Sequence, residues 1–94
     1  MDVTVHVPTS LREFSAGQPR VTLGMSETTT LQDVLGCLHR TNPGVVERVL
    51  DEQGTVRPHV NLFVNGENVR LGQGLQTEVE ANAEVWIIPA VSGG

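Results

Sequence analysis

Apolar and polar side chains alternate along several segments of the chain, which is the pattern of strands with one face buried and the other exposed. Residues 3–7 and 20–23 alternate in this way, and we expect them to form neighbouring antiparallel strands. Residues 84–89 show the same alternation and predict the last strand of the chain. Three of the predicted strands therefore follow from side-chain alternation alone.

A fourth alternating segment precedes the strongest turn signal of the sequence. Residues 60–64 predict a strand, and Asn65 and Gly66 follow it directly. An Asn-Gly pair favours a tight hairpin turn, because both residues tolerate a positive φ angle. The sequence therefore predicts that the chain returns in a short strand over residues 67–70.

The period of the apolar residues changes after Thr30. Four of them then follow at the spacing of one helix face: Leu31, Val34, Leu35 and Leu38. Thr30 can cap the start of this helix, and Asp33 lies in its first turn. Pro43 disfavours helical geometry in the residue before it, so we expect the helix to end near residues 41–42. Residues 45–50 predict a short further helical turn.

The order of these elements predicts an α+β fold in which one main helix packs on one face of a mixed sheet. This is the β-grasp arrangement, with the first and last strands as central neighbours. Ninety-four residues suffice for a single domain. We expect residues 1–89 to form that domain and residues 90–94 to form a flexible C-terminal tail.

Composition excludes several classes of function. The net charge of −5 argues against nucleic-acid binding, and no apolar run approaches the roughly 20 residues that span a bilayer. Cys37 is the single cysteine, and the histidines and carboxylates show no metal-ligand spacing. We expect a cytoplasmic protein that is not itself an enzyme, with no metal and no bound cofactor.

The ending Gly93-Gly94 is the candidate for chemistry. Glycine has no Cβ, so two glycines can enter a tunnel too narrow for side chains. Residues 90–94 reach at most about 16 to 18 Å when extended, enough to pass from the domain surface into a partner's active site. An α-carboxylate is ionised and unreactive at neutral pH, so its reaction requires activation by another enzyme. The alternative is a floppy terminus without chemical function.

The open face of the predicted sheet carries a second candidate site. If Val60, Leu62 and Val64 face the helix, alternation places Phe63 on the opposite face, together with Trp86 and Ile88. His6 would lie beside them. Large aromatic side chains are frequent anchors of protein interfaces, so we expect this patch to dock a partner. The alternative is that a loop covers the patch and that Trp86 belongs to the core.

Three segments resemble the ubiquitin-like sulfur carriers of the thiamin and molybdopterin type, and most closely the actinobacterial carriers that supply sulfur for cysteine synthesis. They are residues 3–11, residues 60–70 and the ending Pro89-Ala90-Val91-Ser92-Gly93-Gly94. Ser92 departs from the alanine that the nearest branch has before its two glycines.

The resemblance implies that Gly94 is adenylated and converted to a thiocarboxylate, with ATP used by the activating enzyme. That enzyme would be an adenylating sulfurtransferase of the ubiquitin-activating type. An acceptor biosynthetic enzyme would then take the sulfur for cysteine, a cofactor or a secondary metabolite. We expect a partner enzyme to hold the tail, through Val91, Ser92 and Gly93.

Two alternatives remain open at this stage. A ubiquitin-like protein modifier has the same ending, but its Gly94 would form an isopeptide bond with a target lysine. The chain contains no lysine, which excludes only side-chain-linked chains of the protein itself. A non-covalent β-grasp interaction module is the second alternative, and it would not need Gly93 and Gly94.

Overall fold

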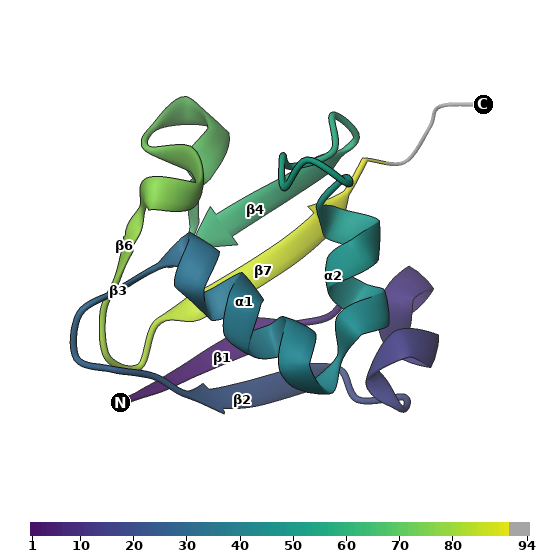
Figure 1. Cartoon of the computed structure of the whole chain (residues 1–94), viewed down its shortest axis with the longest axis horizontal. Coiled ribbons are helices and arrows are strands. Elements are labelled where there is room, and N and C mark those ends of the chain that lie inside the picture. Colours follow the sequence, from purple (N-terminus) through teal and green to yellow (C-terminus); the bar gives the residue numbers. More distant parts are fainter. Residues whose placement is uncertain (91–94) are drawn as a thin grey trace.

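The computed structural model describes residues 1–90, and its main sheet has five strands in the order β2-β1-β7-β4-β5 (Figure 1). β1 and β7 are parallel neighbours at the centre, and the other pairs are antiparallel. This confirms the predicted mixed sheet with the first and last strands in the middle. The strands are β1 (Asp2–His6), β2 (Arg20–Gly24), β4 (Val60–Val64), β5 (Glu67–Asn68) and β7 (Glu84–Pro89).

Two helices cover one face of the sheet (Figure 1). The main helix, α1 (Leu31–Thr41), begins with a capping box in which Thr30 and Asp33 each accept a hydrogen bond from the other's backbone N–H. This satisfies two of the N–H groups that a helix start leaves unpaired. α2 (Pro43–Val49) follows with Pro43 in its first turn. α1 agrees with the sequence prediction, whereas α2 begins two residues before the predicted helical turn and ends one residue before its end.

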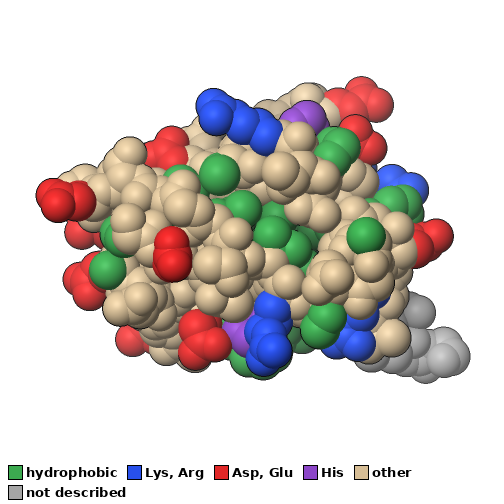
Figure 2. Space-filling view, turned by 90° about the horizontal axis from the view of Figure 1, so that it is seen from below, with side chains coloured by type: hydrophobic (Ala, Val, Ile, Leu, Met, Phe, Trp, Pro, Cys, Tyr) green, Lys and Arg blue, Asp and Glu red, His purple; other side chains and the backbone are tan. Residues whose placement is uncertain are grey.

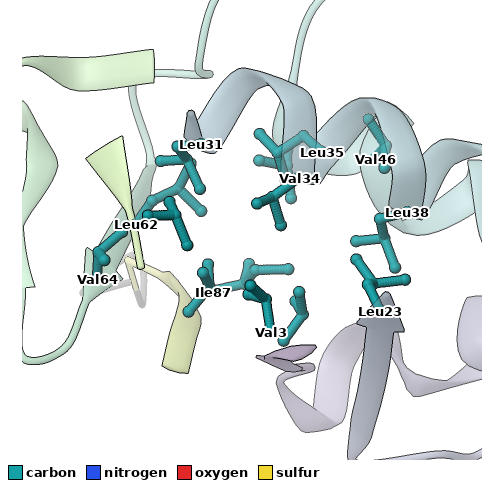
Figure 3. Packing of buried hydrophobic residues seen from close by; sticks show 14 of the residues in the cluster. Val3, Leu23, Leu31, Val34, Leu35, Leu38, Val46, Leu62, Val64 and Ile87 are labelled. Carbon is teal, nitrogen blue, oxygen red and sulfur yellow. The ribbon is translucent and has the colours of Figure 1, made fainter. Parts of the chain in front are cut away.

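The core lies between α1, α2 and the inner face of the sheet (Figure 3). The four apolar residues of α1 are all at most 1% exposed, and the inward positions of β1, β4 and β7 meet them. Ser15 and Thr29 are the buried polar residues among those described, and both form hydrogen bonds. The alternation seen in the sequence therefore divides buried from exposed residues correctly along each long strand.

The strand predicted over residues 67–70 is wrong in its second half. β5 ends at Asn68, whose side-chain oxygen accepts a hydrogen bond from the Arg70 backbone N–H at 3.0 Å. This cap starts the 3₁₀ helix η2 (Val69–Leu71) and turns Val69 into the core, where it is 6% exposed. Local side-chain capping competes here with strand extension.

Four further elements were not expected from the sequence. A 3₁₀ helix, η1 (Thr9–Ser15), fills the loop between β1 and β2, and η3 (Gly74–Gln76) follows η2. Two-residue strands β3 (Thr29–Thr30) and β6 (Glu78–Val79) pair beside the start of α1. β3 and β6 depend on pairing with each other across a long stretch of sequence, and the 3₁₀ helices are held by local hydrogen bonds without an apolar period, so neither kind of element has a local sequence pattern.

Glycine is required at two positions of this fold. Gly66 has φ +87 in the turn between β4 and β5, where Asn65 also has a positive φ of 49, as a tight hairpin turn demands. At Gly44 a Cβ would come within 2.6 Å of Phe14 Cδ1. α2 can therefore pack closely on η1 only because residue 44 has no side chain.

Within the described residues, none of the helices combines the length and the apolar character needed to cross a membrane.

Candidate functional site

The C-terminal segment follows β7, the middle strand of the five-stranded sheet. β7 ends at Pro89, which pairs with Val60, and the Ala90 N–H donates a hydrogen bond of 2.6 Å to the His59 carbonyl oxygen. The main chain is thus attached to the domain through residue 90. The predicted reacting residue and its predicted partner-binding neighbours, namely Val91, Ser92, Gly93 and Gly94, lie outside the described residues.

The other predicted site residues lie together on the open face of the sheet. Trp86 and Ile88 are each 44% exposed, and Phe63 pairs with Trp86 across β4 and β7 and is half-buried. We call these three residues the open-face patch. The alternative in which Trp86 belongs to the core is wrong, because nearly half of its surface remains accessible.

His6 orders the centre of this face. Its ring lies parallel to the Trp86 ring, with centroids 3.6 Å apart and an angle of 2° between the planes. Its Nε2 lies 2.8 Å from Glu84 Oε1. The imidazole therefore connects β1 to β7 through a stacking contact with Trp86 and a polar contact with Glu84. Sequence reasoning placed His6 beside the patch but missed Glu84, because only the register of β1 against β7 brings the two together.

A groove of about 560 Å³ adjoins the open-face patch where β7 ends. Trp86, Ile88 and Pro89 form one part of its lining, and Arg12 and Arg20 bring positive charge to the other. The site thus combines apolar anchors with a basic margin next to Pro89, the last residue of β7.

The described residues carry little that would support intrinsic catalysis. Cys37 is a half-buried free thiol on α1 that packs against the core. Within residues 1–90, no group of three or more His, Cys, Asp or Glu side chains is placed to hold a metal ion. His6, His39 and His59 are on separate elements, and only His6 contacts a carboxylate within that range.

Known proteins resemble this chain over its whole length. The ThiS family model matches residues 5–94. The sulfur carrier protein CysO of Mycobacterium tuberculosis is 38% identical over 96 residues, covering 100% of both chains. Small archaeal modifier protein 3 of Haloferax volcanii is 31% identical over 94 residues, again covering 100% of both chains.

A solved structure agrees with these sequence relationships. The crystal structure of the Amycolatopsis orientalis BexX/CysO complex contains a chain with a TM-score of 0.86 and 32% identity, and the match covers 98% of this chain and 99% of that one. Both the β-grasp fold and the sequence pattern are thus shared with carriers of the same size. The chain belongs to the ThiS family of ubiquitin-like sulfur carriers.

Proposed function

We propose that this protein carries sulfur as a thiocarboxylate on Gly94 and donates it to a biosynthetic acceptor enzyme. The observation that carries the proposal is the family match, which extends through residue 94 and so includes both terminal glycines. Two further features support it. The relative CysO is named a sulfur carrier, and β7 ends beside an exposed aromatic patch on which an enzyme can dock.

The proposed chemistry has two steps. The Gly94 carboxylate attacks the α-phosphorus of ATP, and pyrophosphate leaves to give an acyl-adenylate. A sulfide or persulfide sulfur, supplied by a donor, then attacks the acyl carbon, and AMP leaves with the C–O bond electrons. A persulfide donor must also have its S–S bond cleaved by a thiol. These steps belong to an activating enzyme of the ubiquitin-activating type, and the carrier supplies only the carboxylate.

The residues of this chain act by presenting that carboxylate. Gly93 and Gly94 pass through a narrow tunnel because they have no side chains. Val91 and Ser92 contact the tunnel entrance, and Phe63, Trp86 and Ile88 dock the domain outside it. Association of this kind converts a bimolecular reaction into one between held groups, which lowers its barrier.

Intact-mass spectrometry tests this function. The chain is incubated with an activating enzyme of this class, ATP and a sulfide source, and we expect the mass change of one oxygen replaced by one sulfur. A variant lacking Gly93 and Gly94 is the matched control and should fold normally but remain unchanged in mass. Loading of the truncated variant, or an unmodified full chain although the enzyme forms acyl-adenylate with its own carrier, would overturn the proposal.

A protein-modifier function is the second candidate, and the relationship to small archaeal modifier protein 3 favours it. It predicts that Gly94 forms an isopeptide bond with a lysine of another protein. Expression of a tagged chain in its host, followed by peptide mass spectrometry, would reveal branched peptides that end in Gly94. A carrier that is not a modifier gives none.

A further inference from the structure

Two arginines and a histidine surround the point at which the main chain leaves the sheet. Arg48 on α2, Arg57 in the loop before β4, and His59 line one cavity of about 380 Å³ together with Pro89. We call Arg48, Arg57 and His59 the tail-base cluster. The His59 carbonyl oxygen accepts a hydrogen bond from the Ala90 N–H. The cluster therefore lies directly beside the last described residue.

Neutral groups hold both guanidinium groups in place. Arg48 Cζ lies 4.5 Å from the centroid of the Phe14 ring. Arg57 donates from Nε and Nη2 to the Glu47 carbonyl oxygen, at 3.3 and 3.0 Å. An arginine fixed in this way has lost part of its conformational freedom before any partner binds, while its charge remains uncompensated.

Carboxylates do not neutralise the cluster from within the described chain. Among residues 1–90 the ion pair found joins His6 to Glu84, so neither Arg48 nor Arg57 lies at ion-pairing distance from a carboxylate of that range. Glu47 precedes Arg48 on α2, but it meets Arg57 through its backbone oxygen. The positive charge of the cluster is thus available to another molecule.

The acidic side chains concentrate elsewhere. A separate cavity beside β5 and β6 is lined by Glu67, Glu78 and Glu80 and by no arginine. In Figure 2, acidic side chains gather mostly toward the left, the side of β3 and β6 in Figure 1, and basic ones lie in the middle and toward the right. The tail-base cluster lines a different cavity from these three carboxylates. This asymmetry would orient its approach to a charged partner.

We propose that the tail-base cluster binds carboxylate side chains on the surface of the enzyme that receives Gly94. The enzyme's identity rests on the proposed function, but the recognition of carboxylates does not. Arginine forks pair with carboxylates through two parallel hydrogen bonds. A nucleic acid fits less well, because its long phosphate chain would be repelled by the net charge of −5.

Nuclear magnetic resonance with a hexaglutamate peptide tests the recognition without any enzyme. We expect the peptide to shift the Nε–H signals of Arg48 and Arg57 and the backbone signal of His59, and to leave the Arg40 signals unchanged. R48Q and R57Q should each weaken these shifts, whereas R40Q should not, although all three remove one charge. R48K/R57K, which retains the charges, should keep part of the response. Equal shifts at Arg40, or none at the cluster, would overturn the proposal.

A second titration uses inorganic phosphate in place of the peptide, at the same ionic strength, and follows the same signals. If phosphate shifts the same signals at concentrations as low as the peptide does, the cluster is a general anion site and carboxylate recognition is wrong. We expect phosphate to require a higher concentration, because it cannot contact both guanidinium groups and the protein surface around them at once.

Stopped-flow association with the activating enzyme tests the role of the cluster in docking. Each of R48Q and R57Q should lower the association rate constant about threefold at low salt, and R40Q should leave it unchanged. The difference should vanish at high salt, because mobile ions screen exposed charges. Equal rates for all variants would overturn the docking role. If the enzyme does not load Gly94 at all, the proposed function fails, while the peptide experiment still decides whether the cluster binds carboxylates.

Discussion

Along β7, Val85 and Ile87 lie in the core and are at most 2% exposed, whereas Trp86 and Ile88 are each 44% exposed on the other face. The inner residues contact the helices and the neighbouring strands of the core. On the outer face, Trp86 stacks on His6, lies opposite Phe63 of β4 and keeps 44% of its surface exposed. Through its alternate side chains, one strand thus contributes both to the stability of the domain and to its proposed docking surface. Substitutions can therefore separate the two roles.

Ile87→Ala should have the largest effect on stability. It removes methyl and methylene groups from a site that is 2% exposed, and such truncations cost about 2 to 5 kcal/mol because a cavity remains. Urea denaturation followed by circular dichroism measures the loss. A loss below about 1 kcal/mol would mean that the inner face of β7 contributes little, and the contrast between the faces would disappear.

Trp86→Ala should act mainly on binding. Loss of an aromatic anchor at an interface costs about 2 kcal/mol or more, which corresponds to roughly a thirtyfold rise in the Kd for the activating enzyme. Unfolding should become easier by only about 1 kcal/mol, because the stacking contact with His6 is lost. Calorimetric titration gives the first value. An unchanged Kd would remove the open-face patch from the docking surface.

Thr30→Ala removes the N-terminal cap of α1 and leaves both faces of β7 unchanged. The variant loses the side chain that accepts the Asp33 N–H at 3.3 Å, and removal of such a cap costs about 1 kcal/mol. The Kd for the activating enzyme should not change, because Thr30 lies at the start of α1 and lines neither the groove beside the open-face patch nor the tail-base cavity. Parallel denaturation and binding measurements on one sample check both statements.

Glu84→Gln should have the smallest effect. Its carboxylate contacts His6 at 2.8 Å, but the Glu84 side chain is 56% exposed, and exposed pairs contribute between about 0 and 1 kcal/mol. We expect a change in unfolding free energy below about 0.5 kcal/mol. A larger loss in denaturant titration would show that the open face also supports the fold.

Much of this architecture could be predicted from local patterns. The alternation of residues 3–7, 60–64 and 84–89 identifies the long strands, and the spacing after Thr30 identifies α1 with its cap. Each depends on a period that neighbouring residues express together. The 3₁₀ helix over Thr9–Ser15 has no such period, and β3 pairs with β6 across some fifty residues of sequence.

The candidate site was predicted only in part, for the same reason. Alternation places Phe63, Trp86 and Ile88 on one face, as observed. The contact of His6 with Glu84 and the assembly of Arg48 with Arg57 each require the register and packing of separate elements. Long-range placement of this kind cannot be read from either segment alone.

In the loaded chain, the sulfur is expected on the carboxylate of Gly94. Fragment-ion mass spectrometry locates the residue that carries it. We expect that one oxygen of the Gly94 carboxylate is replaced by sulfur, and that Cys37→Ser is loaded to the same extent. Cys37 could also hold sulfur, as a persulfide, but this would add a sulfur atom without removing oxygen. A sulfur found on Cys37 and absent from Gly94 would contradict the proposal that Gly94 carries the sulfur.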